Sequence, residues 1–476
     1  MRSVGFKSSA RTRATIALAI ISALSGCAVG PDFRVPESTS AATYTPAPQP
    51  ADTEQSQGPG SAAQHFVQAD SIGGGWWRAF GSPALDRLVQ QALDDSPTLA
   101  QARMKLVQAQ QDYLAQAGAT QWPQVDTSLK ATRSKPDPAG SGLGSLVGGR
   151  SFAPFTLYSA KVNVSYTLDL FGANRRSLEA LAAQVDYQQY ELDAARLSLA
   201  GNVVTTAVRR ASLAKQIALT GELLADQGRQ LDITEQRFHA GGVSRMDLLS
   251  QRSQVEQTRA SLAPLRTQLA QADHQLAVYL GIPAAQLVWG GEAGADTLDL
   301  DAFVLPAQVP LTLRSTLAQQ RPDIRASEAL LHQASANVGV AIANLYPQIT
   351  LSADTGPEGV RITDLVNVWS VGANLTQPLF HGGQLQAHKR SAQAAYEAAL
   401  AAYRQTVLQG LQQVADALRA LQQDAIELQS RDAAQRDAQA SAEIASQRFA
   451  VGGLSQLGLL DTERQELQTS LDRTKV

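Results

Sequence analysis

One cysteine gives the clearest chemical signal in this chain. Cys27 is the only cysteine among 476 residues and ends the segment Leu24-Ser25-Gly26-Cys27. An apolar run over residues 14–23 precedes this segment, and a basic stretch precedes the run, as is typical of a secretory signal peptide. The basic residues are Arg2, Lys7, Arg11 and Arg13.

Residues 24–27 match a bacterial lipobox, in which the chain is cut before the cysteine and the new N-terminal residue is acylated. The sequence therefore predicts a lipoprotein signal peptide over residues 1–26 and a covalent lipid on Cys27. Ala28 follows instead of aspartate, which favours sorting to the outer membrane. A chance cysteine in an ordinary signal peptide is the alternative. A single cysteine excludes a disulfide within the chain.

The sequence contains none of several common catalytic and nucleotide-binding motifs. It has no phosphate-binding P-loop, no G-x-S-x-G, no H-E-x-x-H and no paired cysteines. His381 and His388 lie seven residues apart, but their spacing is better explained by coincidence than by metal binding. We therefore expect no catalytic residues, no metal site and no cofactor apart from the lipid, and hence no enzyme. The net charge of −3 offers no basic surface for nucleic acid.

The chain is internally duplicated with an offset of roughly 210–225 residues. The clearest match aligns Gln236-Arg237-Phe238-x-x-Gly241-Gly242-x-Ser244 with Gln447-Arg448-Phe449-x-x-Gly452-Gly453-x-Ser455. We predict a signal peptide over 1–26, an N-terminal anchor and linker over 27–82 and a first repeat over 83–285. A linking segment over 286–311 and a second repeat over 312–476 follow. Each repeat is expected to read helix, strand, strand, very long helix, tight turn, helix.

Four segments alternate apolar and polar residues, which is typical of transmembrane barrel strands. They cover residues 124–134, 158–170, 348–354 and 369–377. A sandwich hairpin with one buried face would show the same period. Four strands cannot close a barrel, and lipid does not tolerate an open sheet edge, so membrane strands would require several chains.

Aromatic residues stand where each predicted strand meets a helix. They are Trp122, Phe171, Tyr346 and Phe380. This placement suits an aromatic girdle at the inner membrane surface. Packing of the strand–helix junctions explains them equally well, and the two interpretations are compatible.

Two very long helices are predicted, over residues 173–240 and 384–451, because neither segment contains proline. At ~1.5 Å per residue each would extend about 100 Å. Their apolar residues step by three, four and seven, as in a coiled coil, and charged residues occur throughout, so we expect them in water. Gly-Gly pairs provide the turns at which each repeat forms a hairpin tip.

These motifs together resemble the TolC-type outer-membrane efflux proteins, in particular the lipoprotein branch that serves resistance-nodulation-division pumps. The resemblance is carried by Gly26-Cys27-Ala28-Val29-Gly30-Pro31-Asp32-Phe33, Trp76-Trp77, Tyr166-x-Leu168-Asp169-Leu170-Phe171-Gly172 and Arg321-Pro322-Asp323-Ile324-Arg325. It implies a mainly α chain with a transmembrane β part, three copies of which form a twelve-stranded barrel continued by a periplasmic helical barrel.

The resemblance also implies an outer-membrane location in a Gram-negative bacterium, an inner-membrane pump as partner and a periplasmic adaptor. The adaptor would contact the tip turns at Gly241, Gly242, Gly452 and Gly453. The function implied is passive export of small molecules through an exit duct. Two other functions remain open, namely the duct of a type I protein secretion system and a periplasmic coiled-coil scaffold without a pore.

The resemblance places a gate at the tips. Asp247 and Asp461 match acidic residues of the family's gate, whereas Phe449, Leu454 and Gly458 stand where the family has tyrosine, arginine and an acidic residue. We therefore expect closure by apolar contact among Phe238, Phe449, Leu457 and Leu460, with Asp461 as a charged ring. Asp247 and Asp461 could instead be solvated residues at helix starts. The last helix is expected to end some fifteen residues earlier than its counterpart.

Overall fold

The computed structural model describes residues 29–36, 44, 50–56, 62–68, 73–135, 153–289, 298–311 and 320–475. The predicted signal peptide and Cys27 lie outside this part. The chain divides into two compact units. We call residues 1–36, 105–189 and 326–404 the sheet unit, and residues 37–104, 190–325 and 405–476 the tip unit.

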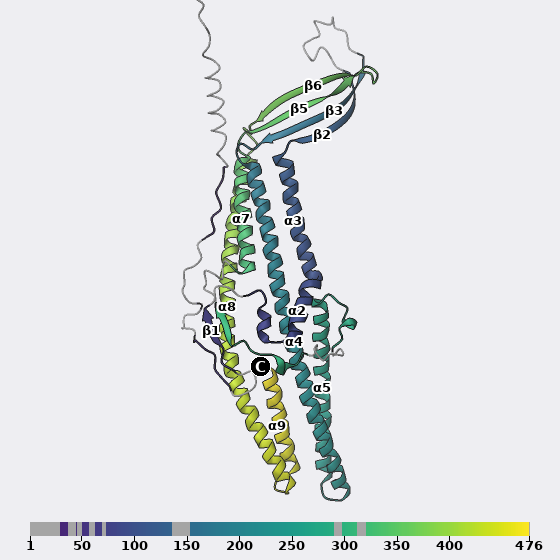
Figure 1. Ribbon diagram of the computed structural model, residues 1–476, viewed down its shortest axis with the longest axis vertical. Helices are drawn as coiled ribbons and strands as arrows, with labels where there is room; N and C mark the ends of the chain where they lie inside the picture. The colour runs from purple at the N-terminus through teal and green to yellow at the C-terminus, as the bar shows by residue number, and fades with distance from the viewer. Residues whose placement is uncertain are drawn as a thin grey trace, which may run out of the picture. The chain divides into compact units, whose positions relative to one another are not determined.

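The two halves of the chain repeat one order of elements (Figure 1). The first half has α3 (Pro97–Gln121), β2 (Gln124–Ser134), β3 (Phe155–Leu168), α4 (Ala173–His239) and α5 (Arg245–Tyr279). The second has α7 (Pro322–Ala343), β5 (Gln348–Gly359), β6 (Val366–Thr376), α8 (Gln384–Ala450) and α9 (Gln456–Lys475). The duplication predicted from sequence motifs is thus present in the order of helices and strands.

The sheet unit contains one four-stranded antiparallel sheet with the order β2-β3-β5-β6. Its centre joins the two halves, because β3 pairs with β5 from Tyr158–Gly359 to Leu168–Ile349. Strand β2 has the predicted bounds, but β5 extends beyond the predicted end at residue 354, past Gly356 and Pro357. The β3–β5 register has no pair at Gly356 and Pro357, and a Cβ at Gly356 would lie 2.0 Å from the carbonyl oxygen of Ala160, so glycine allows the two backbones to approach closely there.

The long helices have close to their predicted lengths, 67 residues each for α4 and α8. The apolar seam predicted along α4 is largely buried, at Leu178, Leu192, Leu199 and Val203. A helix of this length depends on packing along such a seam for its stability. Within the described residues, no helix combines the length and hydropathy needed to cross a membrane.

The remaining described elements belong mainly to the tip unit. They are β1 (His65–Gln68), η1 (Trp76–Phe80), α2 (Pro83–Asp95), η2 (Ala284–Gln286), η3 (Leu300–Ala302) and β4 (Gln308–Leu311). Strands β1 and β4 form a parallel pair. Leu85, Val89 and Leu276 are fully buried in this unit and contribute to its apolar core.

Candidate functional site

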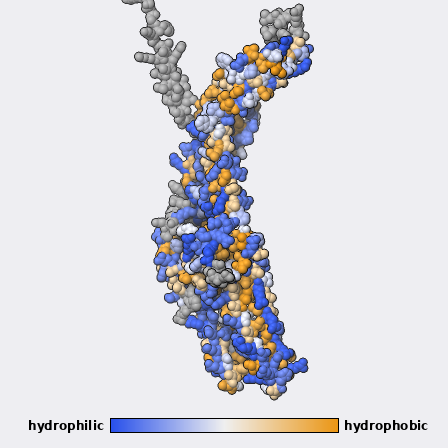
Figure 2. All heavy atoms as spheres, turned by 45° about the vertical axis from the view of Figure 1, so that its right-hand side comes forward, coloured by the Kyte–Doolittle hydropathy of each residue, from blue (hydrophilic) through white to orange (hydrophobic). Residues whose placement is uncertain are grey.

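The four-stranded sheet has one continuous apolar face. Its register aligns Val125, Val164, Ala353 and Val371 in one rung across all four strands. Side chains on this face are exposed, including Leu129 at 84%, Trp369 at 74% and Val371 at 75%. Figure 2 shows apolar residues gathered on the surface of the strands. A sandwich strand would bury this face, so its exposure favours contact with lipid.

The opposite face of the sheet is polar. The neighbouring rung contains Asp126, Asn163, Asp354 and Ser370. Lys161 lies 2.9 Å from Glu358 and 3.6 Å from Asp354, and the Ser370 hydroxyl donates to Asp354 at 2.7 Å. Such a face is suited to a water-filled lumen, because its ion-paired side chains remain partly accessible.

The strand-to-helix junction is built by local chain geometry. The Asp169 carboxylate accepts hydrogen bonds from the backbone N–H groups of Asn174 and Arg175, at 3.0 and 2.9 Å, and so caps α4. Gly172 adopts a φ of 81°, which permits the sharp turn from β3 into the helix. These two requirements explain the aspartate and the glycine of the Asp-Leu-Phe-Gly motif.

The four predicted interface aromatics lie in the sheet unit but do not form one cluster. Phe171 and Tyr346 stack on each other, with ring centroids 4.7 Å apart, because β3 and β5 are neighbours. Trp122 and Phe380 flank the outer strands β2 and β6, and they are 69% and 87% exposed. The first pair packs the junction, whereas the second pair is free to face lipid or another chain.

The two tip turns have the same backbone geometry. Gly241 and Gly452 adopt φ values of 75° and 78°, a region that favours glycine. Gly242 N–H donates to the Arg237 carbonyl and Gly453 N–H to the Arg448 carbonyl, both at 2.8 Å. Paired bonds of this kind satisfy the last carbonyls of α4 and α8 and end each helix with a compact turn.

Asp247 has a structural role at the first tip. Its backbone N–H donates to the Ser244 hydroxyl at 3.2 Å, and its carboxylate accepts from the Ser244 backbone at 3.1 Å. This reciprocal pair is a capping box at the start of α5. The second tip lacks it, because Gly458 occupies the corresponding place. The geometry therefore agrees with the helix-start interpretation of Asp247.

The predicted gate residues separate into different environments of the tip unit. Leu457 and Asp461 are 68% exposed, whereas Leu460 is buried at 6%. Phe449 lies beneath Arg237, whose guanidinium carbon is 5.6 Å from the ring centroid. Phe238 is half-buried and is near the His239 ring at 6.0 Å. The apolar contact predicted among Phe238, Phe449, Leu457 and Leu460 concerns the assembled channel and stays a prediction.

A groove of about 1070 Å³ runs between α5 and α9 at the tips. Leu457, Leu460 and Asp461 line it from α9, and Met246 and Leu249 line it from α5. Two basic residues, Arg245 and Arg464, also line it. Arg464 forms an ion pair with Asp461 one helical turn away, which reduces the field of that carboxylate. The sequence contained this signal in the spacing of Asp461 and Arg464, but our prediction did not use it.

Comparison with known proteins identifies the protein family. The model of the family described as outer membrane efflux protein matches residues 88–282 and 313–475. These ranges cover most of the chain and both halves of the duplication.

The chain belongs to this family. The pyoverdine export outer membrane protein OpmQ of Pseudomonas putida is 31% identical over 391 residues, covering 82% of this chain and 81% of OpmQ. The toluene efflux pump outer membrane protein TtgC of P. putida is 30% identical over 466 residues, covering 95% and 90%. The probable outer membrane lipoprotein SilC of Salmonella typhimurium is 26% identical over 472 residues, covering 96% and 94%.

Solved structures agree with this assignment. The outer-membrane channel OprN superposes with a TM-score of 0.79 at 28% identity, covering 94% of this chain and 95% of OprN. The open-state channel MtrE of Neisseria gonorrhoeae has a TM-score of 0.75 at 25% identity, with 94% of both chains covered. The efflux protein therefore has the fold of the trimeric TolC-type channels, as predicted. It is an outer-membrane exit duct for efflux, and its family and fold are those of channels.

The tip unit of the efflux protein also contains a buried polar seam that the sequence analysis missed. Gln456 of α9 donates to Gln251 of α5 at 3.1 Å, and Gln251 donates to the Gln227 carbonyl of α4 at 3.3 Å. Glu463 accepts from Gln230, while its second carboxylate oxygen is inaccessible and has no hydrogen-bond partner among the described residues. Burial raises the pKa of Glu463, and the nearby charges of Asp226 and Glu466 raise it further.

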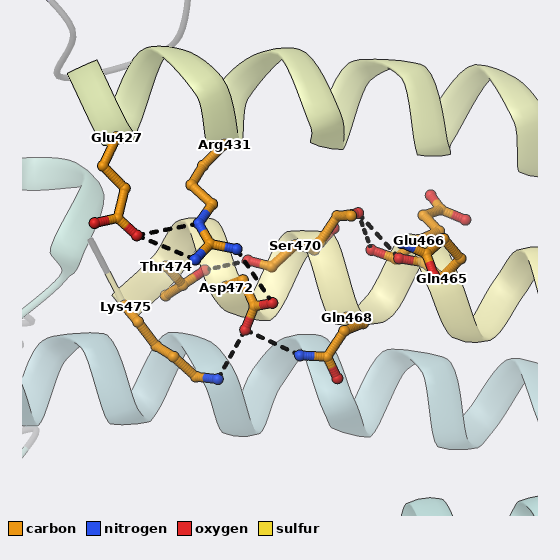
Figure 3. A network of polar contacts seen from close by, with 10 residues as sticks. Glu427, Arg431, Gln465, Glu466, Gln468, Ser470, Asp472, Thr474 and Lys475 are labelled. Atoms are coloured by element: carbon orange, nitrogen blue, oxygen red, sulfur yellow. Dashed lines mark hydrogen bonds and ion pairs between the residues drawn. The ribbon is translucent and has the colours of Figure 1, made fainter. Parts of the chain in front are cut away.

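The end of α9 is tied to its neighbours by ion pairs (Figure 3). Arg431 of α8 lies 3.5 Å from Asp472, which also accepts from Lys475 at 2.9 Å. The Ser212 hydroxyl of α4 donates to the Thr474 carbonyl at 2.9 Å. Although α9 has 20 residues and α5 has 35, its last turn is therefore held on both α8 and α4.

No cluster of three or more histidine, cysteine, aspartate or glutamate side chains that could bind a metal is found among the described residues.

Proposed function

We propose that three copies of this chain close one twelve-stranded barrel in the outer membrane and continue it as a periplasmic duct. The observation that supports this proposal most strongly is that the sheet has an exposed apolar face and an opposite polar face. In the described part of the chain, β2 and β6 each pair with a strand on one side only. Exposed strand edges are costly in lipid, so pairing between chains is the way to satisfy them.

Trimer formation can be tested directly. Native mass spectrometry of the purified protein in mild detergent should give one species with three copies of the chain. A stable monomer that retains its strand content would contradict closure between chains.

We further propose that Cys27 is acylated and holds the mature N-terminus at the inner leaflet of the outer membrane. The lipobox supports this, and the similarity to SilC, whose name includes lipoprotein, agrees with it. More than one acyl chain is needed for stable attachment. Mass spectrometry of the mature N-terminal peptide tests the modification, and an unmodified Cys27 would exclude it.

The partners that we propose are an inner-membrane resistance-nodulation-division pump and a periplasmic adaptor that binds the tip turns at Gly241, Gly242, Gly452 and Gly453. The relatives' names support small-molecule export, since they include pyoverdine export and a toluene efflux pump. These names favour efflux over type I protein secretion. The duct itself requires no catalysis, because a passive pore acts by its width and lining.

The gate proposal concerns ion preference in the resting trimer. Leu457 supplies apolar contact near the axis, and three copies of Asp461 form a ring that attracts cations. Arg464 weakens this ring through its ion pair. We expect weak cation selectivity, which Asp461→Asn should reduce and Arg464→Gln should increase.

Planar-bilayer recordings of the purified trimer test this proposal. Asp247→Ala is the control, because its role in the capping box predicts a local stability cost of about 1 kcal/mol and little change in resting conductance. If Asp247→Ala opens the channel widely while Asp461→Asn leaves selectivity unchanged, the two acidic residues have been assigned the wrong roles.

A further inference from the structure

The segment Val29–Pro36, here called the strap, lies against the rest of the sheet unit through contacts with both halves of the chain. The Val29 N–H donates at 3.1 Å to the carbonyl of Phe171, in the turn between β3 and α4. Asp32 accepts at 2.7 Å from the guanidinium of Arg176, in the first turn of α4. The Phe33 ring stacks on His332 of α7 with centroids 4.4 Å apart. The first two contacts involve the first half of the duplication, and the third involves the second half.

Two glycines allow the strap to approach α7 closely. Gly30 adopts a φ of 105°, and a Cβ built on it would lie 2.6 Å from the Cα of Gly339. A Cβ on Gly339 would in turn lie 2.8 Å from the Cγ of Arg176. Because the first clash involves backbone, a small movement of a flexible side chain cannot relieve it. Glycine at both positions therefore allows the strap to pack on α7 at Gly339, and α7 to pack there on the side chain of Arg176.

Two side chains that the strap contacts, Arg176 and His332, both bind one carboxylate. Glu179 of α4 lies 2.7 Å from Arg176 and 2.9 Å from His332. Arg176 is 94% buried by its neighbours, whereas the Asp32 side chain is 90% exposed. An exposed carboxylate contributes little as an ion pair, so the close packing of Gly30 and Phe33 must provide most of the docking.

From these contacts we infer that the strap is a clamp, which joins the two halves of the duplication at the sheet junction and fixes the N-terminus there. For the lipid, this inference rests on the proposed acylation of Cys27. Only Ala28 separates Cys27 from Val29, so two residue steps limit the distance between the acylated residue and the strap's first docked residue to roughly 7 Å. The lipid is then held on a short tether beside the junction of β3 and α4, where Phe171 stacks on Tyr346.

The test is limited trypsin digestion of the full-length trimer, with mass spectrometry of the peptide released by cleavage after Arg34. A protease needs several residues of undocked backbone, so the cleavage rate is proportional to the fraction of time that the strap is undocked. Gly30→Ala and Gly339→Ala should each increase the cleavage rate at Arg34 by tenfold or more. Phe33→Ala should also increase the cleavage rate at Arg34, and it provides the test if a glycine variant fails to assemble.

Gly118→Ala is the matched control, because nothing lies within 4 Å of a Cβ at that helical position. It should leave the cleavage rate unchanged. A form exported by an ordinary cleavable signal peptide, with serine at position 27, should remain as protected as the parent if protein contacts rather than lipid shield Arg34. Equal cleavage rates in the parent, Gly30→Ala and Phe33→Ala would overturn the clamp.

The same digestion separates the clamp from the lipid assignment. The peptide spanning residues 27–34 should carry the mass of the acyl groups. An unmodified peptide from a protected strap would leave the clamp in place and remove the short lipid tether. A lipidated peptide released equally fast from all variants would retain the lipid and remove the clamp.

Discussion

A charge placed on the apolar face of the sheet should cost far more than the same charge one residue away. Val164 lies in the rung of Val125 and Ala353, whereas Ser165 pairs with Gln124 and Ser352. We expect Val164→Arg to prevent stable barrel formation and Ser165→Arg to be tolerated. The backbone site and the introduced side chain are nearly the same, so the difference measures which face meets lipid.

The magnitude follows from the position of Val164 in β3. Val164 lies four residues before the end of the strand at Leu168, about 13 Å along it at ~3.3 Å per residue. A strand tilt of about 40° converts this to roughly 10 Å of depth, near the middle of an apolar band about 25 Å tall. Arginine at that depth costs ~2–4 kcal/mol per site, or about 6–12 kcal/mol for three chains. This equals much of the stability of a typical folded domain, which is ~5–15 kcal/mol.

Urea-induced unfolding of the trimer in liposomes provides the assay, together with the amount of folded protein in outer-membrane fractions. Val164→Ala separates the effect of charge from the loss of side-chain volume, and should cost much less than arginine. Equal losses for Val164→Arg and Ser165→Arg would refute the two-face reasoning. Loss at Ser165 alone would show that the faces are assigned in reverse.

Two further predictions concern the tip unit. Because the pKa of Glu463 is raised in the folded protein, the native state takes up a proton before the unfolded state as the pH falls. Stability should therefore rise as the pH is lowered through this raised pKa toward 4.5, the ordinary pKa of a glutamate carboxyl. Glu463→Gln should reduce that rise in melting temperature, and an unchanged pH profile would contradict the assignment. Gly452→Ala places a side chain at a φ of 78° and should cost about 1–2 kcal/mol by chemical denaturation, whereas Gly453→Ala should be nearly neutral. Equal costs would show that the turn geometry is not decisive.

Local patterns were sufficient to predict much of the architecture. The period-two alternation placed β2 over Gln124–Ser134, and the absence of proline predicted α4 and α8 to within one residue at each end. The repeated Gly-Gly pairs located both tip turns, where Gly241 and Gly452 adopt positive φ. The family, the channel function and the outer-membrane location predicted from the motifs are confirmed. The domain boundaries, the lipid on Cys27 and the gate residues stay predictions.

The gate shows where sequence matching stops being sufficient. Asp247 was matched to a gate residue, with a helix-start role as the alternative, and its carboxylate caps α5 through Ser244. Leu460 was expected in the apolar closure, yet it is buried within the chain. Which side of α9 faces its own neighbours depends on how the hairpins pack, and the helical period leaves that choice open.

The sequence by itself determined the elements that depend on near neighbours: long helices without proline, amphipathic strands, glycine turns and the duplication that repeats them. Only the tertiary structure decided the contacts between distant residues. It brought Glu463 against Gln230, joined β3 to β5 across the two halves, and placed Gly30 against Gly339. The physical reason is that residue periodicity fixes which side chains share a face, whereas burial and close approach depend on which other face packs against it.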